Sequence, residues 1–390
     1  MRLPIVAASP AIRRSLAQGH PWVYRNQIVP LKGREGTPRY SSGTWVRVLC
    51  GAFEGIGLWE AEGAIAVRLF ATDRVPDDEW LSERVRAAYA LRAPLRDWPA
   101  EGRETTAYRW VYGESDGLPG IVVDLYDRWA AVELYAAGLE ALIDPLFAAL
   151  RAAAPLQGIV LRRGGAREEA RVGVAETAWG RPPSDDLIIR ENGLSFYVNL
   201  LHGQKTGFFL DQRDNRASIA PWCRDADVLN AFSYTGAFGV YALRGGAVHV
   251  TNIDVAPASA PETRRNVALN GFAPSMCDTV VADCFDWLAR AAREGRQFDV
   301  AIIDPPSLAR DKSSRHAAIR AYARLNALAM QCVRPGGILA TASCTGQVSP
   351  EMFREALATG AAQAGRRLLI VHEAGHALDH PVPAHLPEAR

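Results

Sequence analysis

Cys344 is the residue whose type and position most suggest chemistry. It follows a strand-like apolar run in the stretch GGILATASCTGQVS, residues 336–349. A cysteine in such a place is usually a packed core residue. Where the thiolate is accessible and favoured, however, it is a strong nucleophile. The neighbours of Cys344 must therefore decide between a core residue and a covalent catalyst.

Four more predicted strands precede Cys344, and each ends at residues that could bind a ligand. They are followed in order by NAFSYTGAFG (230–239), Asp254, Asp283 and DPPS (304–307). An acid after the second strand can bind both ribose hydroxyls of an adenosine, and one after the third can accept from an exocyclic amine. Singly, such an aspartate is often only a helix N-cap, and such a loop only a turn. Five features in order at successive strand ends favour one shared binding edge.

The small-residue loop after the first strand predicts a close approach of backbone to ligand. Gly236 and Gly239 carry no Cβ, so the main chain there can lie against a bound molecule. The spacing is not G-x-G-x-x-G, which argues against a plain NAD site.

The elements that must position these residues alternate along the chain from about residue 222. Apolar strand runs such as DVLNAF and FDVAIIDPP are separated by helical stretches. This alternation predicts an α/β fold with βαβ units, in which a doubly wound parallel sheet has helices on both faces. Ligands bind such a sheet at the carboxyl ends of its strands.

Two smaller regions precede this sheet in the chain of 390 residues. Residues 1–72 predict a small β-rich domain, in which short strands are separated by glycine and polar turns. Residues 73–185 predict a middle α+β domain that ends near the linker-like GRPPSDD. Residues 186–390 are predicted to form the third domain, which begins with a β-hairpin around Glu191–Asn192–Gly193.

The composition is that of an ordinary globular protein, with 48% hydrophobic and 22% charged residues. No apolar run reaches the roughly eighteen residues of a membrane span. The N-terminus lacks the apolar core of a signal peptide because Pro4, Pro10 and Arg13–Arg14 interrupt it, so we expect a cytoplasmic protein. The six cysteines include no Cys-x-x-Cys pair. This argues against a zinc ribbon or a disulfide framework and predicts mostly small core thiols.

Charge is unevenly distributed, although the net charge is only +1. The first 40 residues hold six arginines and one lysine against a single glutamate, a local net charge of +6. A basic end on a neutral chain suits a polyanionic partner. The same excess of positive charge is equally typical of an ordinary solvent-exposed surface.

Longer motifs resemble one family over nearly the whole chain. GHPWVYRNQI (19–28) resembles the start of its first domain, and GESDGLPGIVVDLYD (113–127) resembles its middle domain. Four further stretches resemble its catalytic region: HGQKTGFFLDQRDNR (202–216), VLNAFSYTGAFGVYAL (228–243), FDVAIIDPPS (298–307) and GGILATASCTG (336–346). The family is that of the bacterial 23S rRNA cytosine-5 methyltransferases that carry an N-terminal PUA domain. The stretch 202–216 is its most specific signal.

This resemblance implies a class I S-adenosylmethionine-dependent enzyme with a PUA-like RNA-binding domain at 1–72. It implies catalysis through a covalent Cys344 adduct, assisted by Asp304, on RNA that is expected to be 23S rRNA. No metal or membrane is implied, and a homodimer stays open. The residues implied to bind the cofactor are Phe209, Asp211, Gln212, Arg213, Asn230, Ser233, Thr235, Gly236, Asp254, Asp283 and Asp304. Those implied to meet substrate are Lys205, Pro305, Pro306, Ser307 and His380.

Ser307 narrows the chemistry that the resemblance implies. Enzymes that methylate exocyclic amino groups usually carry an aromatic ring after the two prolines, where it stacks on the base, and Ser307 cannot stack. Some cytosine-5 methyltransferases have a second cysteine there, so this chain looks like the single-cysteine kind.

Two alternative functions remain for the chain. One is a methyltransferase of the same fold that acts on another nucleotide or a small molecule, and the other is an RNA-binding protein with a vestigial cofactor site.

A second motif points to a different chemistry, namely a metal site. HEAGH (372–376) matches the His-Glu-x-x-His template that binds zinc from one face of a helix. Gly375 weakens a helix there, Pro381 ends one soon after, and no third ligand is evident. We therefore expect no metal site at this stretch.

Overall fold

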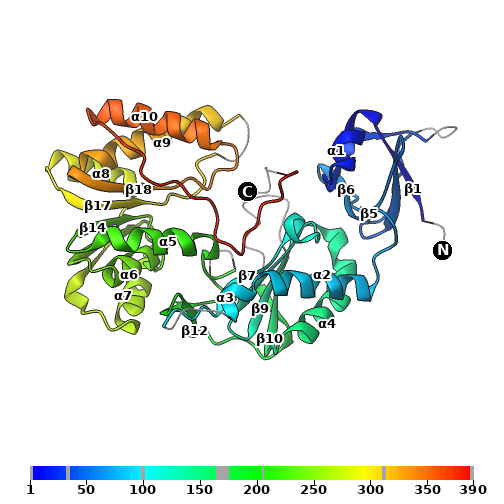
Figure 1. The fold of residues 1–390 in the computed structure, drawn as a ribbon, viewed down its shortest axis with the longest axis horizontal. Helices are drawn as coiled ribbons and strands as arrows, with labels where there is room; N and C mark the ends of the chain where they lie inside the picture. Colours follow the sequence, from blue (N-terminus) through cyan, green and yellow to red (C-terminus); the bar gives the residue numbers. More distant parts are fainter. Residues whose placement is uncertain are drawn as a thin grey trace. The chain divides into compact units, whose positions relative to one another are not determined.

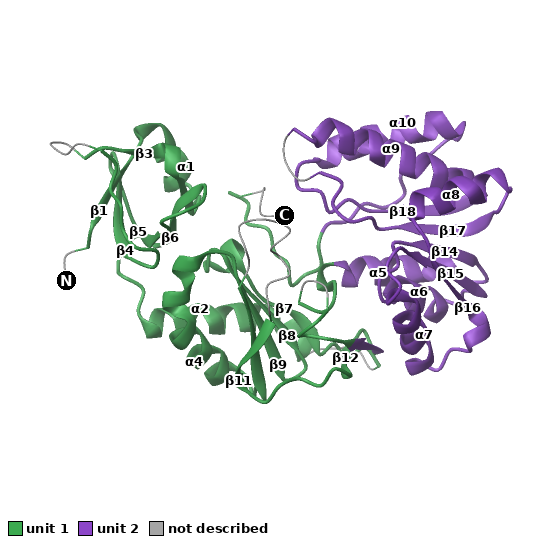
Figure 2. Cartoon of the chain, turned by 180° about the vertical axis from the view of Figure 1, so that it is seen from behind, with its two compact units in different colours: residues 1–193, 198–211, 376–390 green, residues 194–197, 212–375 purple. Residues whose placement is uncertain are grey.

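A computed structural model describes residues 3–31, 36–97, 102–163, 175–203, 206–309 and 313–386. Lys205 lies outside the described residues. The chain forms two compact units, shown in Figure 2. Unit 1 holds Met1–Gly193, Val198–Asp211 and His376–Arg390, and unit 2 holds Leu194–Tyr197 and Gln212–Gly375. No helix in the described part of the chain is long and apolar enough to cross a membrane.

Unit 1 begins with a six-stranded sheet of order β2-β6-β5-β4-β1-β3. The alternation of buried and exposed residues along β4 is typical of a strand with one face on the core. Val6, Val23, Val46 and Val48 are fully buried beneath the sheet. The strands are β1 (Ile5–Ala8), β2 (Trp22–Tyr24), β3 (Ile28–Val29), β4 (Trp45–Cys50), β5 (Phe53–Trp59) and β6 (Ile65–Ala71). The helix α1 (Arg13–Ala17) lies between β1 and β2 in the chain.

A five-stranded sheet of order β11-β10-β9-β8-β7 follows in the same unit. Its apolar face packs in one core with the helices α2 (Asp78–Leu91) and α4 (Ile143–Ala153). Asp77 caps α2 by accepting from the Trp80 amide at 2.8 Å. The strands are β7 (Ala107–Tyr112), β8 (Ile121–Tyr126), β9 (Trp129–Leu134), β10 (Gly158–Arg163) and β11 (Ala175–Gly180), and α3 spans Ala93–Arg96.

The predicted hairpin is confirmed. β12 (Leu187–Glu191) and β13 (Leu194–Val198) form a two-stranded sheet. Asn192 and Gly193 between them have φ angles of 49° and 80°. Two positive φ values in a two-residue turn are what a type I′ hairpin requires, and Asn-Gly adopts them readily.

Unit 2 contains a five-stranded parallel sheet of order β16-β15-β14-β17-β18. The chain runs outward from β14 to β16 and then returns to the other side of β14, so the strand order reverses between β14 and β17. Figure 1 shows α5 to α7 on one face of this sheet and α8 to α10 on the other. The predicted doubly wound α/β fold is therefore confirmed. Its strands are β14 (Asp227–Ala231), β15 (His249–Asp254), β16 (Cys277–Val281), β17 (Phe298–Ile303) and β18 (Val333–Thr341). Its helices are α5 (Arg213–Ile219), α6 (Ala237–Arg244), α7 (Ser259–Leu269), α8 (Cys284–Arg293), α9 (Arg315–Gln331) and α10 (Pro350–Ala364).

Residues 372–376, which match the zinc template, form no helix. The geometry that would place both histidines on one helical face is therefore missing from this stretch.

Arg92 connects three segments of unit 1 at the end of α2. Its side chain is fully buried and forms a bidentate ion pair with Asp116, with Nη1–Oδ1 and Nη2–Oδ2 distances of 2.6 and 2.9 Å. The remaining three N–H groups donate to the carbonyl oxygens of Ala88, Arg109 and Asp379. All five guanidinium donors are thus satisfied, which is what makes a buried charge tolerable.

Replacing Arg92 should destabilise unit 1 strongly. Arg92→Ala leaves the Asp116 carboxylate buried without its partner, so the free energy of unfolding in urea should fall by about 3–5 kcal/mol. Arg74→Ala is the matched control, because Arg74 pairs with Glu83 at 3.4 Å with both side chains about half exposed. That variant should lose less than about 1 kcal/mol. Equal losses in the two variants would contradict the role given to Arg92.

Candidate active site

Two loops meet beyond the carboxyl ends of β17 and β18. The segment Asp304–Ser307 follows β17, and Cys344 lies three residues after the end of β18. The Cys344 Sγ lies 3.5 Å from the carbonyl oxygen of Pro305, to which the thiol donates. Pro305 is buried, whereas Pro306 and Ser307 are exposed. The structure thus brings Cys344 to the Asp-Pro-Pro-Ser loop, as their positions at neighbouring strand ends predict.

Exposure separates Cys344 from the other cysteines. Cys344 is exposed, and the other five are buried. Burial raises the thiol pKa to about 12 in Cys223 and Cys284 and to about 11 in Cys277 and Cys332, and it also raises the pKa of Cys50. A protonated, buried thiol is a poor nucleophile. The prediction that most cysteines pack in the core is confirmed, and Cys344 is the exception.

The Asp304 carboxylate is held by a chain of amides. Its Oδ1 accepts from Gln212 Nε2 at 3.1 Å, and Gln212 Oε1 accepts from Asn215 Nδ2 at 2.7 Å. Gln212 is 8% exposed, while Asp304 is half-buried at the sheet edge. Gln212 therefore orients Asp304, and the cofactor contact that the resemblance implies for Gln212 stays a prediction. Arg213, also implied to bind the cofactor, is fully buried and donates from Nε to Asp214 Oδ1 at 3.1 Å.

Asp254 supports the loop that follows β14. Its Oδ2 accepts from the Tyr234 amide and its Oδ1 from the Ala256 amide, both at 2.9 Å. This fixes a loop in which Phe232 and Tyr234 have φ angles of 61° and 48°, values that residues other than glycine rarely adopt. Strained backbone of this kind persists only where several surrounding contacts fix it. It is most common at binding and active sites. Each carboxylate oxygen retains a lone pair, so Asp254 can still bind ribose hydroxyls as predicted.

The glycines of this loop have a packing role, and the predicted close approach of their backbone to a ligand stays a prediction. A Cβ on Gly236 would lie 2.4 Å from Thr263 Cγ2, and one on Gly239 would lie 2.6 Å from Asn252 Oδ1. Gly236 also has a φ of 79°. The space beside both glycines is filled by the protein itself, so they permit close packing of α6 against its neighbours.

Asn230 and Asp283 also have structural partners. Asn230 is 1% exposed and donates from Nδ2 to Asn252 Oδ1 at 2.8 Å, which joins β14 to β15. Asp283 is exposed, and its Oδ1 accepts from the Asp286 amide at 3.0 Å as the N-cap of α8. The capping alternative for Asp283 is therefore confirmed. Cofactor contacts of Asn230 and Asp283 stay predictions.

The hydroxyl side chains of the loop after β14 are buried. Ser233 and Thr235 are 8% and 4% exposed. Among the described residues, the Thr235 Oγ1 is buried without a hydrogen-bond partner. A buried hydroxyl of this kind costs stability unless a ligand or water satisfies it. With the Asp254 carboxylate at the next strand end, these residues fit the ribose and amino-acid groups of S-adenosylmethionine.

The first half of the stretch 202–216 is anchored to the middle sheet. Thr206 is buried, and its Oγ1 donates to Asp124 Oδ2 at 2.6 Å and contacts the Tyr126 hydroxyl at 2.9 Å. Asp124 is fully buried and pairs with Arg109. Burial would lower the pKa of Arg109, but the adjacent Asp124 carboxylate raises it above its ordinary value. This ion pair and Thr206 fix the backbone that leads to Phe209 and Asp211.

Phe209, Asp211 and His380 belong to unit 1, whereas Asp304 and Cys344 belong to unit 2. His380 is 5% exposed, its Nδ1 lies 3.1 Å from Asp379 Oδ1, and its ring packs edge-on to Tyr112. The Asp211 carbonyl accepts from the Ala377 amide at 3.1 Å. The cofactor and substrate roles of these three residues stay predictions.

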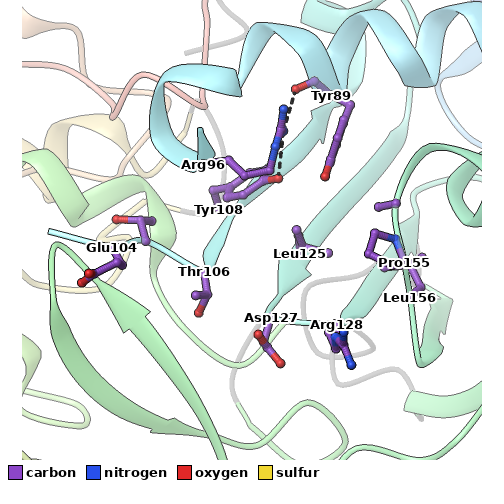
Figure 3. Close-up of a pocket in the computed structure, with 12 residues that line it drawn as sticks. Tyr89, Arg96, Glu104, Thr106, Tyr108, Leu125, Asp127, Arg128, Pro155 and Leu156 are labelled. Atoms are coloured by element: carbon purple, nitrogen blue, oxygen red, sulfur yellow. Dashed lines mark hydrogen bonds between the residues drawn. The ribbon is translucent and has the colours of Figure 1, made fainter. Parts of the chain in front are cut away.

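A separate cavity of about 310 Å³ lies beside the middle sheet (Figure 3). Arg96 lies over the Tyr89 ring and donates to the Tyr108 hydroxyl at 3.4 Å. The wall opposite is formed by Pro155 and Leu156. None of the residues predicted to act on cofactor or substrate lines this cavity.

Sequence reasoning missed one residue beside Cys344. Tyr322 lies in the middle of α9 and reaches the Cys344 loop with its hydroxyl. No local motif marks it, because its role depends on how α9 packs against the sheet.

Comparisons with known proteins agree with this geometry. Residues 121–372 match the S-adenosylmethionine-dependent methyltransferase family, and residues 9–72 match the PUA-like domain. A protein of Alteromonas mediterranea named "Ribosomal RNA large subunit methyltransferase I" is 37% identical over 98% of this chain and 96% of its own. One of Deinococcus radiodurans, named "Ribosomal RNA large subunit methyltransferase", is 38% identical over 95% of this chain and 92% of its own. A crystal structure of a methyltransferase complexed with SAH has a TM-score of 0.85 at 22% identity, covering 99% of this chain and 97% of that one.

Cys344 should be the cysteine that iodoacetamide modifies in the native protein. At about pH 8 the four thiols with pKa values of about 11 or 12 are protonated, and burial excludes the reagent from all five other cysteines. Intact-mass spectrometry should show one modification, and peptide mapping should place it on Cys344. Cys344→Ser should remove it, and unfolding in guanidinium should expose all six thiols. Modification of a buried cysteine at the same rate would show that exposure does not distinguish Cys344.

Proposed function

The chain belongs to the S-adenosylmethionine-dependent methyltransferases, and on that premise we propose that it methylates the C5 carbon of a cytosine in large-subunit ribosomal RNA. The RNA substrate is supported by the names of relatives that match nearly the full chain and by the PUA-like match at its start. The observation that carries the C5 chemistry is the exposed Cys344, whose Sγ lies 3.5 Å from the loop that begins at Asp304.

The chemistry needs a nucleophile because the C5 carbon of cytosine is itself poorly nucleophilic. A thiolate that adds to C6 forms an S–C6 bond and makes C5 electron-rich. After C5 has gained its methyl group, a base takes the C5 proton, the S–C6 bond breaks and the thiolate returns. Covalent catalysis of this kind divides one difficult step into easier ones.

The side chains of unit 2 match these requirements. S-adenosylmethionine, when bound, supplies an electrophilic methyl group. Cys344 is accessible to a base at the sheet edge, and the Asp304 carboxylate, oriented by Gln212, can accept a hydrogen bond from the cytosine edge. Addition of the thiolate to C6 moves negative charge to N3, which takes up a proton from water. A carboxylate that accepts a hydrogen bond from the resulting N–H stabilises that form of the base.

The loop after β17 argues against methylation of an exocyclic amine. Ser307 is exposed and donates to the Ala309 carbonyl at 2.9 Å, so no aromatic ring is present at that position to stack on a base. A cytosine in a duplex would have to be flipped out of the stack at a cost of a few kcal/mol. An open loop or an unpaired nucleotide of the RNA is therefore the favoured target.

Removal of the thiol should abolish the reaction. Cys344→Ala should lower methyl transfer to unmodified ribosomal RNA by roughly three orders of magnitude or more, because no S–C6 bond can form. Binding of S-adenosylmethionine, measured by calorimetry, should stay nearly unchanged. Radiolabelled methyl transfer followed by nucleoside analysis gives both the rate and the modified atom.

A matched control and a trapping experiment complete this test. Cys332→Ala removes a fully buried thiol of the same unit and should retain transfer at the wild-type rate. RNA that contains 5-fluorocytosine should become covalently attached to the wild type but not to Cys344→Ala. Full activity of Cys344→Ala would rule out the covalent mechanism. Methylation of a small molecule or of another atom would favour the corresponding alternative.

Removal of the negative charge of Asp304 should slow the chemical step, even when the side chain at this position keeps its place. Asp304→Asn retains an oxygen that can accept from Gln212, so the loop should stay in place, but the negative charge is lost. We expect kcat to fall roughly 100-fold with little change in KM for RNA. Asp278→Asn, which alters a 70% exposed carboxylate near the start of β16, is the control. Equal kcat values for the two variants would remove Asp304 from the mechanism.

A further inference from the structure

The two chain neighbours of Cys344 are bound to one buried tyrosine. Tyr322 is fully buried in α9, and its hydroxyl lies 2.7 Å from Thr345 Oγ1. The Ser343 Oγ donates to the same phenol oxygen at 3.0 Å. The Thr345 amide in turn donates to Ser343 Oγ at 3.3 Å. The exposed Cys344 is thus held between two residues that share Tyr322 as their partner.

Thr345 connects this group to the loop that follows Asp304. The Leu308 amide donates to Thr345 Oγ1 at 3.0 Å, and Ser307 Oγ lies 3.5 Å from the same atom. Thr345 is 3% exposed, so water does not compete freely for these bonds. One hydroxyl therefore joins the Cys344 loop, the Asp304 loop and α9.

The Tyr322 phenol stays protonated within this group of hydroxyls. Burial raises the pKa of Tyr322 above its ordinary value, and the nearby Cys344 and Asp304 act in the same direction. The phenol thus keeps its proton at neutral pH. Because its oxygen accepts from Ser343, its proton is available to Thr345, which also accepts from the Leu308 amide. The Tyr322 ring itself is held edge-on to Phe353 of α10, with centroids 5.2 Å apart.

We propose that Tyr322 is a positioning residue for the reaction at Cys344, because its hydroxyl holds the Cys344 loop and the Asp304 loop in one arrangement through Ser343 and Thr345. The proposal rests on the proposed function of Cys344 as nucleophile. Tyr322 itself touches neither substrate nor cofactor. Its effect should therefore appear in the rate of covalent bond formation and not in binding, since small misplacements of reacting groups lower rate steeply.

The first test removes one oxygen atom. Tyr322→Phe keeps the ring packed on Phe353 but deletes the hydroxyl. We expect kcat to fall about 10- to 100-fold. The rate of covalent trapping on 5-fluorocytosine RNA should fall by a similar factor, while KM for RNA and the affinity for S-adenosylmethionine stay at wild-type values. Tyr108→Phe is the matched control, since it deletes a buried hydroxyl that accepts from Arg96 in unit 1, and its kcat and trapping rate should be those of the wild type.

A second pair of variants tests the Thr345 hydroxyl without altering Tyr322. Thr345→Val keeps the shape of the side chain but loses the hydroxyl, and it should reproduce the defect of Tyr322→Phe. Thr345→Ser keeps the hydroxyl and should restore most of kcat. If the two hydroxyls act as one unit, the double variant Tyr322→Phe, Thr345→Val should be little worse than either single variant.

The outcomes separate this proposal from the proposed function. Wild-type trapping with normal kcat and trapping rates in Tyr322→Phe and Thr345→Val would overturn the positioning role and leave Cys344 as the nucleophile. A fall in kcat of equal size in Tyr108→Phe, or one explained by a raised KM, would also overturn it. If the wild type forms no adduct and Cys344→Ala stays active, the proposed function fails first, and the positioning role falls with it.

Discussion

The parallel pairing of β14 with β15 on one side and β17 on the other is the constraint on which the site depends. It reverses the strand order next to β14, so that loops from neighbouring strands diverge at one edge of the sheet. The register continues into β18, where Ile302 pairs with Ala340 and Ile303 with Thr341. Because β17 and β18 end at paired residues, the residues that follow each strand lie close together at the carboxyl edge of the sheet. Contact between Cys344 and Pro305 follows from that register.

Burial then separates one thiol from five others. A cysteine in the core packs like a small apolar side chain, and the low dielectric around it disfavours the thiolate. The pKa values of the buried cysteines are raised for this reason, which keeps their thiols protonated at neutral pH. Cys344 lies beyond the end of its strand, where the chain has left the core. Its position beyond the strand end leaves its thiol exposed.

The sequence predicted the parts of the site that follow from strand order, and it could not predict those that follow from packing. Alternating apolar runs were enough to place Asp254, Asp304 and Cys344 at the carboxyl edge. The packing role of the glycines at 236 and 239 was missed, because only the folded chain shows Thr263 and Asn252 beside them. Tyr322 was missed because it lies 22 residues from Cys344 in the chain and approaches it only when α9 packs on the sheet.

The two halves of the stretch 202–216, the most specific sequence signal, contact different neighbours. Up to Asp211 the chain belongs to unit 1, where Thr206 is bound to the buried Asp124 beneath Arg109. From Gln212 it belongs to unit 2, where Gln212 orients Asp304. A substitution at Thr206 would leave a buried carboxylate with one donor fewer, and one at Gln212 would remove a donor to the Asp304 carboxylate. Two separate sets of buried polar contacts thus constrain one short segment, which leaves few residue types acceptable along it.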